Sequence, residues 1–345
     1  MPEPILPAAR SYRWPQPWAF VLLPIPYGVF LGYLQTALPW LLRQTGYPVD
    51  QIGSIVALVL APMTLYFLWS PLVDFRLRRR TWNLVLSILS GALLAAAILL
   101  LKNHPQLAIG TLVLGFSTNL LTCSCGGALI ALTQGEPGEP ARAQAAAWMQ
   151  GGMLTAQALG GALLLYLSRR LTTPATALIA ALLVALPGLI TLTIPEPAPQ
   201  NSGRHLGHTL RAMGREVRET LFRWHALPAL LLLVSPVGTA AAQSLFAAMA
   251  REYSVGEHGV LLLNGILGGV LTMLGAFAAV IVPAAWDRRI AYAAAGLVCG
   301  LSGAFLAFAP TTPWAYYAGV SLYMCSSGLC YAFFLGVVVI AMGQA

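Results

Sequence analysis

The sequence predicts an all-α polytopic membrane protein, and three observations lead to this fold class. The mean hydropathy is +0.74 and only 9% of the residues are charged, so the chain has too little polar surface to cover a soluble globule. Apolar stretches of about 20 residues recur along the chain, which is the length that crosses a bilayer as a helix. The alternating pattern of a membrane β-barrel is absent, and lipid admits only helices and closed barrels as spanning structures.

Ten such stretches are predicted to be membrane helices, and all nine Trp support their boundaries because indole rings favour the membrane interface. In chain order the helices cover residues 17–41, 51–73, 82–101, 106–132, 143–167, 174–194, 226–250, 258–284, 289–309 and 314–341. The Trp residues at or near their ends are Trp14, Trp18, Trp40, Trp69, Trp82, Trp148, Trp224, Trp286 and Trp314. The start of the chain lacks a cleavable signal pattern, so the first helix is expected to be retained.

The chain repeats part of itself. "LSGALLAAA" at 89–97 returns as "LSGAFLAFA" at 301–309, and an acidic and basic cluster precedes each copy at nearly the same interval. Chance explains the strings alone equally well, but the shared surroundings favour internal duplication. The offset of 212 aligns the last residue with Thr133, two helices before the first half ends. We therefore expect ten helices of a twelve-helix protein in a truncated chain, and the alternative is a natural ten-helix carrier.

The predicted helices fall into two halves. Residues 1–194 form a six-helix N-terminal half, residues 195–225 a linker, and residues 226–345 a four-helix C-terminal half. Within the linker, leucines and other apolar residues share one face of a helix whose remainder is mostly arginine, which predicts an amphipathic helix on the inner leaflet. Two repeated halves with a route between them are typical of a transporter.

Orientation follows from the basic residues, which accumulate in cytoplasmic loops. A cytoplasmic N-terminus places fourteen of the 19 Lys and Arg inside and leaves Arg43, Lys102, Arg169, Arg170 and Arg251 outside. The net charge of +8 then reflects topology and contact with the anionic lipid bilayer, and no nucleic-acid partner is expected. The five Cys lie in apolar segments and His205 and His208 lie in the linker, so neither a metal nor another cofactor is expected.

The run from residue 26 to residue 75, "PYGVFLGYLQTALPW…FLWSPLVDF", resembles the first two helices of the muropeptide-permease (AmpG-like) and acetyl-CoA-transporter branch of the major facilitator superfamily. Segments 139–161 and 261–277 are similar to the fifth and eighth helices of bacterial members. The resemblance implies a two-half helical bundle in a bacterial inner membrane, with helices one, four, seven and ten around a central cavity. It also implies a small-molecule substrate and alternating access, and we expect a monomer.

Superfamily members carry a conserved acidic and basic pattern between helices two and three, which this chain matches in part. Asp74, Arg78 and Arg79 fall on its positions, whereas Ser70, Phe75 and Leu77 depart from it. A carboxylate at a helix end can pair with arginines and hold the cytoplasmic side shut. The resulting gate prediction comprises Asp74, Arg76, Arg78, Arg79, Asp287 and Arg288, the last two from a weaker copy in the second half. The competing interpretation is a surface cluster that only sets topology.

Helices one and seven share Pro, Gly and Gln, as Pro26, Gly28, Gln35 and Pro236, Gly238, Gln243, which predicts bends at depth. Buried amides and hydroxyls need partners or water, which places them in the bundle interior. The predicted cavity residues are Tyr27, Tyr33, Gln35, Asn119, Gln243, Asn264, Tyr323 and Ser326, and the alternative for each is a contact between helices. No Asp, Glu, His, Lys or Arg lies clearly at mid-membrane, which argues against proton coupling.

These observations favour a secondary transporter that moves a small or amphiphilic solute. A polytopic membrane enzyme would need acid, base or metal ligands that converge near one interface, whereas Asp50, His104, Glu252, Glu257 and His258 are spread singly along the chain. A sensor or scaffold derived from a transporter remains a second alternative.

Overall fold

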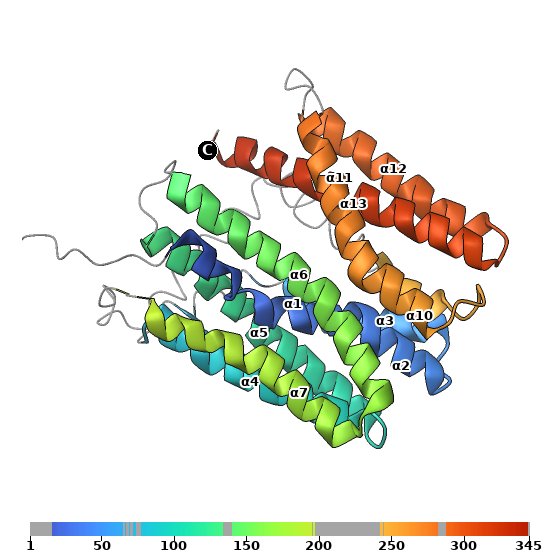
Figure 1. Ribbon diagram of the computed structural model, residues 1–345, viewed down its shortest axis with the longest axis horizontal. Helices are drawn as coiled ribbons and strands as arrows, with labels where there is room; N and C mark the ends of the chain where they lie inside the picture. The colour runs from blue at the N-terminus through green and yellow to red at the C-terminus, as the bar shows by residue number, and fades with distance from the viewer. Residues whose placement is uncertain are drawn as a thin grey trace, which may run out of the picture.

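The structure is a computed structural model that describes residues 16–64, 66, 69, 72–73, 77–133, 140–194, 196, 242–243, 245–281 and 288–343. Within these residues the chain forms helices and no strand (Figure 1). Seven helices in this part of the chain are long and apolar enough to cross a membrane. The linker beyond Glu196 and the start of the seventh predicted helix, with Pro236 and Gly238, lie outside the described residues.

The N-terminal half contains six helical segments, several of them divided. The first comprises η1 (Pro17–Val21), α1 (Ile25–Gly32), η2 (Tyr33–Ala37) and α2 (Leu38–Gln44), and the second comprises α3 (Val49–Leu60) and η3 (Ala61–Met63). The third, fourth and fifth are α4 (Arg79–Leu100), α5 (Pro105–Thr133) and α6 (Pro140–Arg170). The sixth comprises α7 (Thr173–Ala185) and η6 (Leu186–Thr193).

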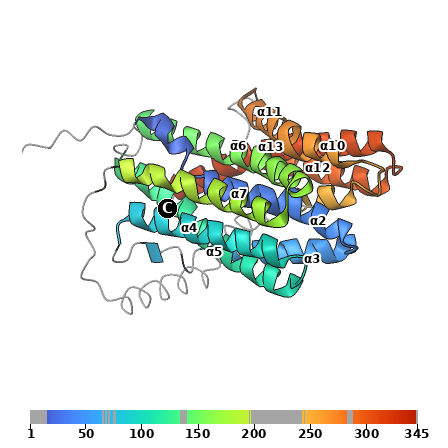
Figure 2. The ribbon, with the colours of Figure 1, turned by 60° about the horizontal axis from the view of Figure 1, so that its bottom comes forward.

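The described part of the C-terminal half starts with helical residues at 242–243 and 245–249. It continues with α10 (Glu257–Val260), η8 (Leu261–Leu267) and α11 (Gly268–Ile281), which together form the eighth predicted helix, and then with α12 (Arg288–Phe308) and α13 (Pro313–Gly343). Figure 2 shows α4, α5 and α7 on one side of the bundle and α11, α12 and α13 on the other. The fold class is therefore the predicted one, a two-half helical bundle.

Glycine brings α1 and α6 into backbone contact. A Cβ added at Gly28 would lie 2.5 Å from Met153 O, and one added at Gly161 would lie 2.5 Å from Gly32 O. Only a residue without a side chain fits such a contact, and close approach between small residues is how helices associate in lipid, where no hydrophobic driving force acts between them. The contact fixes α6 against the first helix inside the N-terminal half.

A second glycine contact closes the C-terminal half, where a Cβ at Gly275 or Gly328 would collide with the backbone of the facing helix, at Cys325 O and Thr272 O respectively. The two halves meet along α6 and η8. Here a Cβ at Gly265 would lie 2.6 Å from the Ala162 methyl group. Small residues thus line the contact between the halves as well as the contacts within them.

Two helices contain π-helical turns that face the centre of the bundle, η2 in the first helix and η8 in the eighth. Pro39 follows η2 and has no N–H to donate to the Gln35 carbonyl, which explains why regular α-helical bonding stops there. In η8 the backbone leaves helical geometry at Gly265, with φ −95° and ψ −105°. Such turns are frequent at functional sites because they redirect side chains, and each of these carries an amide residue into the cavity described below.

Candidate functional site

A cavity of about 450 Å³ lies between the two halves. Its wall includes residues of α1 and η2, α3, η3 and α6 from the N-terminal half and of η8, α11, α12 and α13 from the C-terminal half. A volume of this order is typical of small-molecule sites, which run from about 300 to 1,000 Å³. Of the predicted cavity residues, Tyr27, Gln35, Gln243 and Asn264 line this wall.

The polar part of the N-terminal wall is a pair of glutamines. Gln157 Nε2 on α6 donates a hydrogen bond to Gln35 Oε1 on η2 over 2.5 Å, and Gln35 is 7% exposed. This bond uses the oxygen of one amide and the nitrogen of the other. Gln35 Nε2 and Gln157 Oε1 therefore keep donor and acceptor capacity for a molecule in the cavity.

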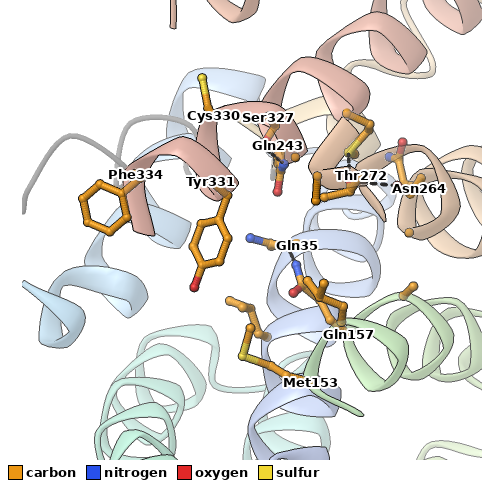
Figure 3. A pocket seen from close by; sticks show the side chains of 18 of the residues that line it. Gln35, Met153, Gln157, Gln243, Asn264, Thr272, Ser327, Cys330, Tyr331 and Phe334 are labelled. Carbon is orange, nitrogen blue, oxygen red and sulfur yellow. Dashed lines mark hydrogen bonds between the residues drawn. The ribbon is translucent and has the colours of Figure 1, made fainter. Parts of the chain in front are cut away.

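The C-terminal wall carries its own amides. Gln243 Nε2 donates to Ser327 Oγ over 2.9 Å, which leaves Gln243 Oε1 with acceptor capacity. Asn264 Nδ2, on η8, donates to the hydroxyl of Tyr316 over 3.3 Å. Figure 3 shows Gln35 and Gln157 together on one side, Gln243 beside Ser327 on the other, and the ring of Tyr331 next to them. Amides from both halves thus approach one space.

The remaining wall is mainly apolar. Within the described residues it contains no Asp, Glu, Lys, Arg or His. The aromatic side chains Tyr292, Tyr331 and Phe334 lie toward the end of the bundle at which α12 begins and α13 ends. The cavity is a neutral site with amide and hydroxyl groups on an apolar background.

The structure places the other four predicted cavity residues in contacts between or within helices. Asn119 is fully buried on α5, and its Nδ2 donates to Pro26 O over 2.9 Å. Tyr323 packs edge-on against Phe246, with ring centroids 4.9 Å apart, and the hydroxyl of Ser326 donates to Leu322 O of its own helix. The hydroxyl of Tyr33 is buried and has no hydrogen-bond partner in the described part of the chain.

Two ion pairs join the halves at one end of the bundle, which we call the Arg43 end. Arg43 Nη2 lies 3.1 Å from Glu252 Oε1, and Arg169 Nη2 lies 3.6 Å from Glu257 Oε2. Each arginine belongs to the N-terminal half and each glutamate to the C-terminal half, so we call these pairs the inter-half ion pairs. Arg251 adds a hydrogen bond in the opposite direction, from its Nη1 to Arg43 O over 3.4 Å. The Arg43 end is therefore closed by polar contacts between the halves.

Tyr253 supports this end from within the C-terminal half. Its hydroxyl donates to Leu306 O on α12. Burial, with a smaller contribution from the neighbouring Glu252 carboxylate, raises the pKa of Tyr253 above its ordinary value. The phenol therefore stays protonated and keeps its donor role.

From the sequence, Glu252 and Glu257 were interpreted as isolated charges, and the structure shows that each pairs with an arginine of the other half. A signal was available, because Arg43, Arg169 and Arg251 are three of the five basic residues that the orientation argument leaves on the minority side. A basic residue on the side whose loops carry few basic residues suggests a specific acidic partner. The identity of that partner was not readable, since Arg43 and Glu252 are 209 residues apart.

At the opposite end, which we call the Arg79 end, Glu196 caps α4. Its two carboxylate oxygens accept hydrogen bonds from the backbone N–H groups of Arg79 and Arg80, over 2.8 and 3.0 Å. A carboxylate at a helix N-terminus satisfies free amides and complements the helix dipole. Glu196 was not among the predicted site residues.

Three of the predicted gate residues belong to the described part of the chain, and their backbones lie at this Arg79 end. Arg79 begins α4 and Arg78 is its N-cap residue, while Arg288 begins α12. Asp74, Arg76 and Asp287 and the side chain of Arg288 lie outside the described residues. The gate therefore stays a prediction.

The comparisons with known proteins agree with this architecture. The family model of the Major Facilitator Superfamily matches residues 20–345, and a search of the curated proteins finds no match. Among solved structures, a D-xylose–proton symporter aligns with a TM-score of 0.62 at 13% identity, over 91% of this chain and 80% of that one.

The nucleoside transporter NupG aligns with a TM-score of 0.62 at 14% identity, over 95% of this chain and 82% of that one. The xylose transporter XylE from E. coli, in a partially occluded inward-open conformation, aligns with a TM-score of 0.62 at 14% identity, over 95% and 88% of the two chains. At these identities the likeness concerns the fold. With a family match over nearly its whole length, the chain belongs to the Major Facilitator Superfamily and is a secondary transporter that works by alternating access.

Proposed function

We propose that the cavity between the halves is the substrate site and that the inter-half ion pairs close one of its two entrances. The observation that carries this proposal is the polar pairing of the halves at the Arg43 end, above a cavity that both halves line. Alternating access requires a site in contact with both halves and a barrier on one side at a time. The arrangement meets both requirements.

The cavity extends from the middle of the bundle toward the Arg79 end. Gln35 lies midway along the first helix, whereas Tyr292 lies in the second turn of α12 and Phe334 lies near the far end of α13. These positions support a state that is closed at the Arg43 end and accessible from the Arg79 end. The Asp74, Arg76, Arg78, Arg79, Asp287 and Arg288 cluster would close the Arg79 end in the opposite state, and Glu196 would fix the start of α4 for it.

The excess of basic residues supports a cytoplasmic Arg79 end, with the chain in a bacterial inner membrane and its N-terminus inside. Reporter fusions near Arg78 and Arg215 should then report the cytoplasm, and fusions near His104 and Glu257 the outside. An inverted pattern at any of the four positions would refute this orientation.

The resemblance of residues 26–75 supports a place near the muropeptide-permease and acetyl-CoA-transporter branch. Muropeptides carry carboxylates and acetyl-CoA carries phosphates, and such anions need basic partners in a buried site. The cavity wall offers none among its described residues. The D-xylose symporter and the nucleoside transporter that share the fold are named for uncharged solutes, which suits this wall better.

A reversible cross-link tests the proposed closure. In a background without the five native cysteines, Arg43→Cys and Glu252→Cys are joined with a bis-methanethiosulfonate, and Ser327→Cys in the cavity is probed with a membrane-impermeant thiol reagent. We expect reaction from either face of proteoliposomes before cross-linking and from the Arg79 face alone afterwards, with full recovery on reduction.

The single variant Arg43→Cys, treated with the same reagent, controls for modification without a cross-link. Reaction from both faces in the cross-linked protein, or from neither face in any state, would overturn the proposed closure.

A further inference from the structure

We propose that the transported solute is uncharged, contains a ring, and carries hydrogen-bonding groups on two sides. This inference rests on the proposed function of the cavity and names its substrate class. Three observations carry it: the wall has no charged side chain among the described residues, amides approach from both halves, and aromatic rings line one flank.

The described residues of the wall carry no countercharge, and this selects against ions. An ion that leaves water for a mostly apolar cavity loses hydration worth several kcal/mol, and only an opposite charge with good geometry restores it. The inter-half ion pairs do not serve this purpose, because Arg43, Glu252, Arg169 and Glu257 satisfy one another at the Arg43 end and none of them lines the cavity. A charged solute is therefore disfavoured relative to an uncharged one of the same shape.

The amides define which uncharged molecules fit. Gln35 Nε2 and Gln157 Oε1 offer a donor and an acceptor from the N-terminal half, and Gln243 Oε1 offers an acceptor from the C-terminal half. An amide matches hydroxyl, carbonyl and ring N–H groups equally well. A hydrocarbon would leave these groups unpaired, and each unpaired buried group costs about 1–3 kcal/mol. The solute must therefore present polar groups to both halves.

The aromatic side chains of Tyr331 and Phe334 are the reason why we expect the solute to contain a ring. Figure 3 shows both aromatic side chains on the same side of the space that Gln35 enters. Aromatic side chains stack on flat apolar faces, and two stacked or edge-on rings gain about 0.5–1.5 kcal/mol beyond area burial. A solute ring with polar groups at its edge can stack its apolar face on these aromatic side chains. Its polar groups can then form hydrogen bonds with the amides.

Ser327→Cys provides a probe of charge selectivity that needs no known substrate, because Ser327 lines the cavity and its Oγ accepts from Gln243 Nε2 there. The five native cysteines are replaced, and the purified protein is treated with methanethiosulfonates that carry a hydroxyethyl, a trimethylammonium-ethyl or a sulfonatoethyl group. Rates are divided by those at Thr311→Cys, an exposed position in the turn between α12 and α13. We expect the neutral reagent to react at least about tenfold faster than both charged reagents.

A matched pair of variants tests the cause. Met63 lines the cavity and is 41% exposed, so Met63→Lys introduces a cation at its margin and Met63→Gln a neutral polar group. The Lys variant should raise the rate of the sulfonate reagent relative to the trimethylammonium reagent several-fold, and the Gln variant should leave that ratio unchanged.

The outcomes separate the two proposals. A charged reagent that reacts with Ser327→Cys as fast as the neutral one would overturn the inference and leave the cavity as an entry path. Failure of all three reagents would show that the cavity is not an entry path, which overturns the proposed function and the inference together.

Discussion

Neutralising the two glutamates of the inter-half ion pairs should shift the carrier toward the state that opens at the Arg43 end. Glu252→Gln and Glu257→Gln keep the side-chain volume and remove only the charge. The glutamates are a cleaner choice than the arginines, because Arg43 also donates to Tyr47 O over 3.2 Å. The ion pairs form only while this end is closed, so their loss raises the free energy of the closed state alone.

The size of the shift follows from the exposure of the pairs. The side chains of Arg43 and Glu252 are 26% and 43% exposed, and those of Arg169 and Glu257 are 40% and 24% exposed. Solvent screens such pairs, and exposed ion pairs contribute about 0.2–1 kcal/mol each. One substitution should therefore change the ratio of open to closed molecules by about 1.4- to 5-fold, and both together by about 2- to 30-fold, if the pairs act independently.

Single-molecule energy transfer measures this ratio directly. Donor and acceptor dyes are attached at Asn103→Cys and Thr311→Cys, two exposed positions in Arg43-end turns of opposite halves, in a background without native cysteines. The double variant should increase the population with widely separated dyes. Wild-type protein in about 1 M salt should approach the double variant, because the Debye length falls to about 3 Å.

Lys102→Gln is the matched control, since it removes a charge at the same end from a residue that takes part in neither inter-half ion pair. The exchange Arg43→Glu with Glu252→Arg should restore most of the wild-type ratio. If the double variant leaves the two populations unchanged, or if the exchange behaves like a single reversal, the ion pairs do not hold this end closed.

Three further substitutions test contacts that position the site. Gly161→Ala should destabilise the protein by about 1–3 kcal/mol, because its Cβ would meet the first helix, whereas Gly151→Ala, whose Cβ meets open space, should be neutral in a thermal melt; equal melting temperatures would refute the glycine contact. Glu196→Gln should cost about 0.5–2 kcal/mol through the weakened cap of α4, and a melting temperature equal to wild type would show that the cap is not stabilising. Asn119→Leu should lower stability by about 1–3 kcal/mol, because it removes the hydrogen-bond partner of Pro26 O, while the neutral-reagent rate at Ser327→Cys stays within about twofold of the rate without this substitution. A large change in that rate with normal stability would instead place Asn119 at the cavity.

The fold could be predicted almost entirely from the sequence, because membrane insertion imposes length and hydropathy on each helix separately. The third helix was expected at 82–101 and is found as α4, Arg79–Leu100. Divisions within helices were harder to place. Pro26 and Gly28 suggested a bend, and the first helix breaks between Val21 and Ile25, directly before Pro26. A second irregular turn, at Tyr33–Ala37 before Pro39, was not expected, although a proline disturbs the turn that precedes it.

Residues of the candidate site could be predicted only where the chemistry of the side chain alone determines where the residue lies. Gln35 and Gln243 were expected at the cavity because a membrane-embedded amide needs a polar environment, and the symmetry of the two halves supports both. Asn119 has the same chemistry but serves a helix contact, and only the packing of α5 against α1 distinguishes the two uses. Pairings such as Gln35 with Gln157, 122 residues apart, depend on tertiary geometry that no local pattern encodes.

The small residues between α6 and the facing part of η8 and α11 affect how readily the two halves can move relative to each other. Gly265 and Gly269 rest on the methyl groups of Ala162 and Ala158. Glycine and alanine have no side-chain rotamers to lose, so this contact can break and form again in a shifted register at almost no cost in side-chain conformational entropy. A larger residue at position 158 or 162 would have side-chain rotamers, and some of them would be lost each time the contact forms again. The contact therefore adds little to the free-energy barrier between the two states of the carrier. The rate at which the states interconvert is then set by the charged and bulky groups at the two ends.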